Sequence, residues 1–525
     1  MPGHFTPSDA QQLASHGISV EEAERQLALL AHPPAPVVLD RPCTIGDGIV
    51  RVGAEEGREL LRLHADAADR GRVGMFVPAS GAASRMFRDL MICRAEPELM
   101  TPQGLDAAAR AGRAEARAMR EFLAGIDRFA FFAGLKAEAE RNGARLRDLV
   151  RSGPYETILE ALLDEETLDA ARTPKGLLPF HAYPEGPRAA FEEHLIEATQ
   201  VVADGEGVCR LHFTVSPEHR RRFEARIADV GPQLEERLDV RLDVELSEQR
   251  PATDTIAAAL DGEAFRHADG SLLLRPSGHG ALIENLADLP GDLVMVRNID
   301  NVAHDRFKPP TFSWSRIVIG MVAGLERRAV ELLRRLESGA DATATEEAAH
   351  FLRETFHRVP PPDAAGNGAA ANSALAAWAH SQLARPIRVC GMVPNTGEPG
   401  GGPMWVRGTD GEVTPQIVEL SQVNNADPAQ KKVVASATHF NPVFMALALR
   451  DARDRVYPLA QFVDRQAVMI ARKSDGGREL KTLERPGLWN GAMAGWNSRF
   501  VEVPLTVFNP VKTVNDLLRQ EHQPG

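Results

Sequence analysis

Two patterns of hydrophobic and polar positions alternate along the chain. Helical spacing covers residues 19–31 (SVEEAERQLALLA), 53–70 and most of 101–171. Short apolar runs that predict strands lie at 73–77, 210–215, 240–246, 293–297, 386–393, 416–420 and 500–504. Strands that alternate with helices are typical of βαβ units, so we expect an α/β fold with a mixed, mostly parallel sheet.

The same pattern suggests two boundaries. Residues 1–72 are mostly helical in pattern and precede the first buried strand, so they are predicted to form an N-terminal helical extension. Residues 338–374 are rich in Ala, Gly and Pro, a composition typical of loops, and are predicted to be a linker or a long loop.

Composition narrows the class of protein. With 43% hydrophobic and 25% charged residues, the 525-residue chain has the balance of a soluble globular protein. The net charge of -13 argues against a general nucleic-acid binder. The four cysteines are scattered, as in a reduced protein, and neither a signal peptide nor a membrane-spanning run is recognisable. We therefore expect a cytoplasmic protein without nucleic-acid or membrane partners.

Two segments have residues suited to phosphate. In 77–87 (VPASGAASRMF), small residues follow a strand, so backbone N–H groups could approach a phosphate chain whose charge Arg85 would neutralise. In 173–180 (TPKGLLPF), Lys175 offers a compact ammonium. Only eight lysines occur among 60 basic residues, so exchange with arginine is a poor explanation for it. The alternatives are a tight turn and a solvated lysine.

Three further segments suit a nucleotide and a cation. Two of them are 249–254 (QRPATD) and 275–282 (RPSGHGAL), and in the latter the glycines on both sides of His279 make a flexible turn (the glycine-flanked turn) where a base or ribose could pack closely on the backbone. In 297–301 (RNIDN), Asp300 ends a hydrophobic strand, where ligands bind in α/β sheets, and could hold Mg²⁺. Ordinary turns are the alternative for each.

The order of these segments resembles the sugar-1-phosphate nucleotidyltransferases, in particular the UDP-N-acetylhexosamine and UDP-sugar pyrophosphorylases. Residues 80–86 (SGAASRM) fall on that family's GGxGTRLG, 276–282 (PSGHGAL) on its PPGHG turn, and 299–301 (IDN) on its VDN. Further matches are 416–422 (QIVELSQ) to QVVEYSEI, 438–440 (THF) to NHFF, 500–503 (FVEV) to YEV and 508–515 (FNPVKTVN) to FSPLKN. The whole chain also resembles an uncharacterised bacterial family marked by GLWNGAM at 487–493.

The resemblance implies a fold and a reaction. The fold would be a Rossmann-like α/β nucleotidyltransferase of the GT-A type, with 73–337 as its nucleotide-binding part and 375–525 as its sugar-phosphate-binding part and C-terminal segment. The reaction would join an NTP, with UTP favoured, to a sugar 1-phosphate with Mg²⁺, giving an NDP-sugar and pyrophosphate.

The resemblance also implies roles for individual residues. Arg85 would hold the β- and γ-phosphates, Lys175 the α-phosphate and Lys512 the sugar phosphate, while Asp300 would bind Mg²⁺. The remaining candidates are Ala79, Ser80, Gly81, Ser84, Gln249, Gly278, His279 and Gly280 for the nucleotide, and Asn301, Glu419 and Asn441 for the sugar substrate.

The phosphate loop departs from the family pattern. Ser80 and Ala83 replace glycines and Phe87 stands where the family has another, so added side chains could crowd the triphosphate. Two alternatives stay open: a glycosyltransferase or other NDP-sugar user on the same fold, and a protein that binds a nucleotide or sugar phosphate without turnover. Lys175 and Lys512 favour nucleotidyl transfer, and pyrophosphate release separates the three.

Overall fold

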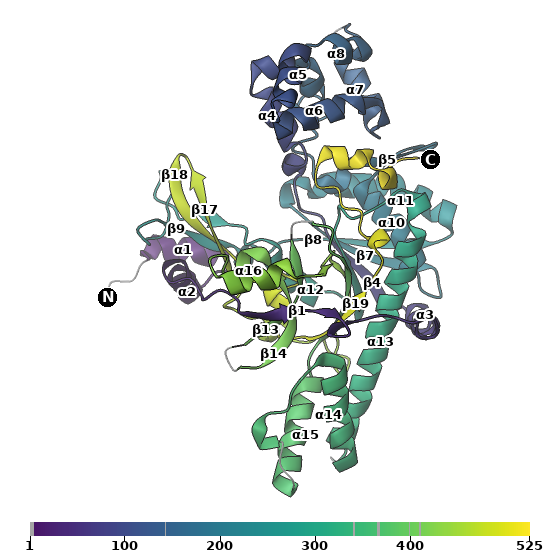
Figure 1. Cartoon of the computed structure of the whole chain (residues 1–525), viewed down its shortest axis with the longest axis vertical. Coiled ribbons are helices and arrows are strands. Elements are labelled where there is room, and N and C mark those ends of the chain that lie inside the picture. Colours follow the sequence, from purple (N-terminus) through teal and green to yellow (C-terminus); the bar gives the residue numbers. More distant parts are fainter. Residues whose placement is uncertain are drawn as a thin grey trace.

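A 10-stranded sheet forms the centre of the computed structural model, which describes residues 5–141, 143–339, 342–364, 368–397, 400–408 and 411–524 (Figure 1). In spatial order its strands are β2 (Thr44–Ile45), β3 (Gly48–Val50), β19 (Asn497–Glu502), β12 (Ile387–Pro394), β16 (Phe444–Ala448), β11 (Leu293–Arg297), β4 (Val73–Pro78), β7 (Val208–Val215) and β8 (Arg241–Glu248), with β15 (His439–Phe440) beside β12. Only β16 and β15 run antiparallel to their neighbours in this sheet of the described chain. The predicted mixed, mostly parallel α/β sheet is confirmed.

The central strands are apolar because both faces of the sheet are covered. Along β4, Val73, Met75 and Val77 pack into one core and Phe76 into the other. Strand β11 alternates in the same way. The long helix α13 (Pro309–Glu337) crosses the first face, with α3 (Ala54–Asp69), α10 (Ala190–Val201) and α11 (Arg220–Leu238) in the same layer, and the short helix α12 (Leu282–Ala287) packs on the second. Continuous apolar strands of this kind are typical of parallel sheets.

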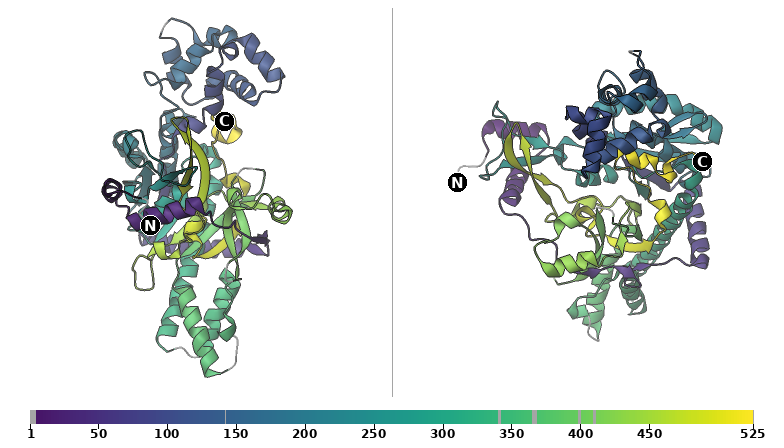
Figure 2. Two further views of the ribbon diagram at one scale, coloured as in Figure 1. Left: turned by 90° about the vertical axis from the view of Figure 1, so that its left-hand side faces the viewer. Right: turned by 45° about the horizontal axis from the view of Figure 1, so that its top comes forward.

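A helical lobe follows the loop after β4. Its helices are α4 (Arg88–Arg94), α5 (Pro102–Arg110), α6 (Ala114–Ala124), α7 (Phe132–Ala139), α8 (Leu146–Ser152) and α9 (Glu156–Leu163), as the pattern in 101–171 predicted. They bury a second hydrophobic core, to which Val511, Val514, Leu517 and Leu518 of the C-terminal segment also contribute. Figures 1 and 2 show the lobe standing apart from the sheet, with the C-terminal residues (yellow) between the two.

The predicted N-terminal helical extension is helical only in part. Helices α1 (Pro7–Ser15) and α2 (Val20–Ala31) pack on a small sheet of β10 (Leu274–Arg275), β9 (Thr255–Ala259), β18 (Arg478–Glu484) and β17 (Met469–Asp475). Strands β2 and β3, however, are the outermost strands on one side of the central sheet. Strand β1 (Leu39–Pro42) pairs with β13 (Gly401–Arg407), which also pairs with β14 (Val413–Glu419). Residues far along the chain supply these pairing partners, so the local pattern did not predict them.

The prediction of a linker or long loop at 338–374 is wrong where the chain forms helices. Helices α14 (Ala342–Phe356) and α15 (Ala369–Leu383) form a hairpin beyond α13, while residues 340–341 and 365–367 lie outside the described residues. Ala348 and Leu352 are fully buried in this hairpin. Alanine has the highest intrinsic helix propensity, so the high alanine content favours helices here. The remaining elements are β5 (Pro179–Tyr183), β6 (Gly186–Ala189) and α16 (Pro428–Ala435).

None of the described helices combines the length and the apolar composition that crossing a membrane requires.

Candidate functional site

Most of the predicted site residues meet at one edge of the central sheet. Strands β4, β8, β11 and β19 run parallel and end at this edge, and the antiparallel β16 begins there. The loop 79–85 follows β4, Gln249 follows β8, Asp300 follows β11, Lys512 follows β19, and Asn441 precedes β16. This is the edge at which α/β sheets bind their ligands.

Asp300 lies between two lysines. Lys175 Nζ donates to Asp300 Oδ2 at 2.9 Å and to the carbonyl oxygen of Val511 at 2.8 Å, and Lys512 Nζ lies 3.1 Å from the same Oδ2. The side chains of Lys175 and Asp300 are 12% and 11% exposed, whereas that of Lys512 is 53% exposed. Burial works to raise the pKa of Asp300, but the two ammonium groups outweigh it and hold the pKa below its ordinary value. The cluster keeps one net positive charge.

The phosphate-loop candidate and the lysine segment form one unit. Lys175 N–H donates to the carbonyl oxygen of Gly81 at 3.1 Å, and Ala83 N–H donates to that of Thr173 at 3.3 Å. Ser80, Gly81, Ser84 and Arg85 are exposed, while Ala79 is buried and donates its N–H to Thr214. The exposed part of the loop therefore lies beside the Lys175 backbone.

One departure from the family loop does not crowd this surface. The Ala83 side chain is fully buried and packs into the core of the helical lobe with Met86 and Phe87. Ser80 is exposed, and a side chain added at Gly81 would meet no atom within 4 Å. Of the two residues that replace family glycines, Ser80 is therefore exposed on the loop surface, whereas Ala83 is buried.

The glycine-flanked turn is held against the segment that marks the uncharacterised family. Gly278 has a φ of +77°, and a side chain at Gly280 would lie 2.1 Å from the carbonyl oxygen of Pro486. The His279 ring stacks on Trp489 with centroids 4.0 Å apart, and its Nδ1 accepts the N–H of Leu488 at 2.9 Å. Both glycines are thus required by conformation or close approach. Sequence reasoning missed Trp489, although it lies in the GLWNGAM motif.

Three other candidates lie in different settings. Glu419 Oε1 is 3.6 Å from His279 Nε2, so this sugar candidate adjoins the turn assigned to the nucleotide. The Nε2 atom of Gln249 is buried without a hydrogen-bond partner among the described residues. The buried Asn441 accepts the Val443 N–H through Oδ1 at 3.2 Å.

The Asn301 side chain bonds to the backbone of its own chain. It is 1% exposed. Its Oδ1 accepts the Asn509 N–H at 2.8 Å, and its Nδ2 donates to the carbonyl oxygen of Val507 at 3.3 Å. The resemblance implies that Asn301 contacts the substrate. In the structure both ends of its amide are already bonded to backbone groups, so its side chain holds the chain instead.

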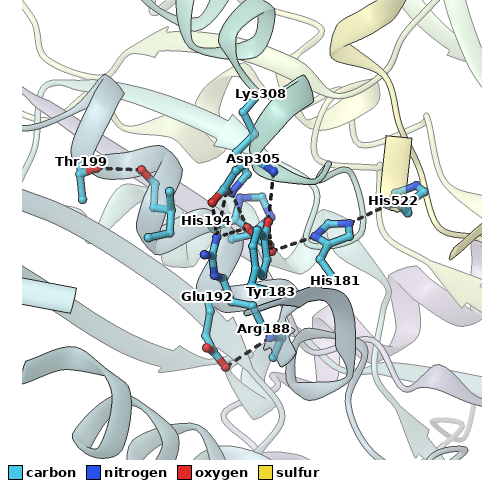
Figure 3. Close-up of polar contacts among 12 residues, drawn as sticks. His181, Tyr183, Arg188, Glu192, His194, Thr199, Asp305, Lys308 and His522 are labelled. Atoms are coloured by element: carbon cyan, nitrogen blue, oxygen red, sulfur yellow. Dashed lines mark hydrogen bonds and ion pairs between the residues drawn. The ribbon is translucent and has the colours of Figure 1, made fainter. Parts of the chain in front are cut away.

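A second charged cluster, which sequence reasoning did not assign, is centred on Glu193 of α10. Arg188 Nη1 donates to Glu193 Oε2 at 3.1 Å, Lys308 bonds the same oxygen, and His181 Nδ1 lies 2.8 Å from Oε1. Figure 3 shows Arg188, Lys308 and His181, which come from three different segments, close to one another. Burial works to raise the pKa of Glu193, but Lys308 and His181 outweigh it and hold the pKa below its ordinary value. The cluster is closed to solvent, which points to a structural role.

The residues around Asp300 offer a cation one protein carboxylate. Within the described ranges, no group of three or more His, Cys, Asp or Glu side chains could hold a metal ion. Asp300 Oδ1 has only a long contact with Lys512 Nζ, at 3.4 Å. Mg²⁺ binds proteins through one or two carboxylates together with substrate phosphates and water. The donor set thus fits Mg²⁺ bound together with a phosphate substrate.

Comparisons with known proteins give one family and several distant structural likenesses. No curated protein matches the chain. The chain is similar to a mutant UDP-glucose pyrophosphorylase from Leishmania major in complex with UDP-glucose (11% identity, 99% of this chain and 78% of that one, TM-score 0.48). It is also similar to the UDP-N-acetylglucosamine pyrophosphorylase from Trypanosoma brucei in complex with an inhibitor (12% identity, 98% and 79%, TM-score 0.47). Likenesses at this level assign no activity to the chain.

The match to a protein family is much more extensive. The sequence pattern of the family described as "Domain of unknown function (DUF4301)" covers residues 6–523. It includes the lobe, both charged clusters and the GLWNGAM segment that predicted an uncharacterised family. The chain therefore belongs to the DUF4301 family.

Proposed function

We propose that this protein is a sugar-1-phosphate nucleotidyltransferase, which joins an NTP, with UTP favoured, to a sugar 1-phosphate. The observation that carries the proposal is the Lys175–Asp300–Lys512 cluster. It keeps a net positive charge and has a half-exposed ammonium at the ligand-binding edge of the sheet. Surplus positive charge at such a place suits phosphate groups. The reaction class is inferred from the ordered motifs between residues 73 and 516, which resemble those of the sugar-1-phosphate nucleotidyltransferases.

The reaction needs positioning and charge stabilisation. A phosphate oxygen of the sugar 1-phosphate attacks the α-phosphorus of the NTP in line. The new O–P bond forms as the bond to the β-phosphate oxygen breaks, and pyrophosphate leaves. The protein therefore needs no nucleophile of its own.

The residues at the sheet edge have distinct roles in the proposal. Lys175, fixed by Asp300 and Val511, would stabilise charge on the α-phosphate, and Arg85 with the exposed loop would hold the β- and γ-phosphates. Lys512, whose side chain is half exposed, would bind the sugar phosphate. Asp300 would hold Mg²⁺ together with substrate phosphates, and the ion would neutralise part of the triphosphate charge.

The base would lie at the glycine-flanked turn. His279 offers the edge of a ring that Trp489 supports. The unpartnered Gln249 Nε2 is a donor that a base carbonyl would satisfy. Two groups thus favour a nucleotide here.

Pyrophosphate release tests this function. The purified chain is incubated with each of four NTPs and a panel of sugar 1-phosphates, with and without Mg²⁺, and pyrophosphate and the NDP-sugar are measured. We expect one NTP and one sugar phosphate to give equal amounts of both products, and Asp300→Asn to abolish them. Nucleotide binding without either product would favour the protein that binds without turnover, and transfer of sugar from an added NDP-sugar would favour a glycosyltransferase.

A further inference from the structure

The turn that carries Asp300 bonds a later part of the chain near its start, in its middle and near its end. We call residues 503–523, which follow β19, the strap. The strap contacts Asp300 through the backbone of Val511. The Asn301 side chain bonds the backbone of Val507 and Asn509 near the start of the strap. The backbone N–H of His304 donates to the carbonyl oxygen of Glu521 near its end, at 2.9 Å. Lys512 lies between these two anchors.

The second anchor is reinforced by a buried side chain. His522 is 1% exposed. Its ring stacks on His181 with centroids 5.2 Å apart, and its Nδ1 lies 2.9 Å from His181 Nε2 (Figure 3). His181 in turn contacts Glu193, the centre of the closed cluster. The end of the strap is therefore tied, through His181, to a fully buried carboxylate.

The middle of the strap is fitted to the catalytic candidates. Val511 N–H donates to the carbonyl oxygen of Asp300 at 2.9 Å, and the Val511 carbonyl accepts from Lys175. The next residue is Lys512. A backbone that is already fixed on both sides of Lys512 does not have to be ordered when the ammonium binds a phosphate, so less entropy is lost on binding.

We propose that Asn301 and His522 are positioning residues that hold the strap, so that Lys512 is presented to the sugar phosphate. The proposal rests on the proposed function for its substrate, but the anchoring itself does not. In this proposal Asn301 affects the substrate by positioning Lys512 and does not contact the substrate itself. The proposal also gives the closed cluster, through His181, an indirect part in the site.

Hydrogen–deuterium exchange of the full chain tests the anchoring without any reaction. The variants are Asn301→Ala, which removes both amide bonds, and His522→Phe, which keeps an aromatic ring but removes the bond to His181. The control is Asn509→Ala, because among the described residues that side chain bonds only the carbonyl oxygen of Thr506, within the strap. We expect exchange at the 509 and 511 amides to rise about tenfold or more in Asn301→Ala and exchange at 518–523 to rise in His522→Phe. Unchanged exchange in both variants would overturn the proposal.

Kinetics tests the consequence for Lys512. If positioning acts through Lys512, Asn301→Ala should raise KM for the sugar 1-phosphate about tenfold, with a much smaller change in KM for the NTP, and Asn509→Ala should change neither. Equal increases in both KM values would contradict an action through Lys512. If the unmodified protein releases no pyrophosphate with any substrate, the proposed function fails, while the exchange experiment still decides whether the strap is anchored as proposed.

Discussion

Glu193 and Asp300 are each paired with at least two cationic side chains, yet only the cluster around Asp300 is open. At Glu193 the carboxylate is 0% exposed and its partner Lys308 is 3% exposed. At Asp300 the carboxylate is 11% exposed, but its partner Lys512 is 53% exposed. The same kinds of residue therefore form a sealed cluster in one place and an accessible one in the other.

The two clusters also differ in charge balance. Asp305, whose side chain is 42% exposed at the rim of this cluster, adds a second carboxylate beside Lys308 and Arg188 and balances their charge together with the buried Glu193. Among the described residues, no second carboxylate forms an ion pair with the lysines at Asp300. A buried uncompensated charge is strongly destabilising, so surplus charge persists where water or an anion can reach it. The comparison indicates that the sealed cluster stabilises the fold, whereas the open cluster has a positive charge that an anionic ligand could reach.

The largest expected effect comes from breaking the sealed cluster. Glu193→Gln keeps the shape of the side chain but leaves Lys308 and Arg188 with one buried charge too many. We expect the free energy of unfolding to fall by about 3–5 kcal/mol, measured by urea denaturation. The control is Glu185→Gln, an exposed partner of the same Arg188, which should cost within about 0.5 kcal/mol. Equal losses in both variants would contradict the distinction between the clusters.

Removing the inner lysine of the open cluster should affect catalysis most. Lys175→Ala is expected to lower kcat about 10²–10³-fold, or about 3–4 kcal/mol, because a fixed charge stabilises the transition state more than the ground state. Lys175→Arg should rescue only in part, since a planar guanidinium does not replace a compact ammonium. Pyrophosphate release is the measurement, with the exposed Lys431→Ala as the control. Near-normal release by Lys175→Ala would exclude the catalytic role.

Acid should weaken the region around the sealed cluster. Burial lowers the pKa of His194 and of His522 to about 3 in the folded protein. The unfolded chain, with histidine pKa values near about 6.5, takes up these protons first, so stability is lost as the pH falls below that value. Between pH 7.5 and 5.5 we expect a loss of about 1 kcal/mol for each histidine. His194→Gln and His522→Gln should each flatten this pH dependence of unfolding.

The outer lysine of the open cluster should act on one substrate. Lys512→Ala is expected to raise KM for the sugar 1-phosphate about tenfold, or about 1.4 kcal/mol, and to change KM for the NTP less. Because the Lys512 side chain is half exposed, the free energy of unfolding should change little. Initial rates at varied concentrations of each substrate measure this split. A larger change in KM for the NTP would move Lys512 to the nucleotide.

The smallest expected effects concern the phosphate loop. Ala83→Gly removes a methyl group from the core of the lobe and should cost about 1 kcal/mol of stability without tightening nucleotide binding. Ser80→Gly lies on the exposed side of the loop and should tighten UTP binding in a calorimetric titration if Ser80 crowds the triphosphate. Weaker binding by Ser80→Gly at equal stability would show that the serine suits its present ligand.

Much of the site could be predicted because its residues follow buried strands. Loop 79–85 follows β4 and Asp300 follows β11, and parallel strands end at a common edge. The rarity of lysine also drew attention to Lys175 and Lys512. The role of Asn301 in holding the strap could not be predicted, because its partners lie 206 and 208 residues further along the chain. The chain's substrates and its use of Mg²⁺ remain predictions.

By itself, the sequence determined the class of the fold and the strands at the centre of the sheet, and it supplied the candidate residues for phosphate. These depend on local apolar runs and on side-chain chemistry, both of which can be read along the chain. Only the tertiary structure decided that Lys175 and Lys512, 125 and 212 residues from Asp300, share one carboxylate. It also decided that the alanine-rich segment 342–356 is a packed helix and that the acidic residues of α10 are sealed inside. Charge balance and burial arise from contacts between distant segments, so a local pattern does not contain them.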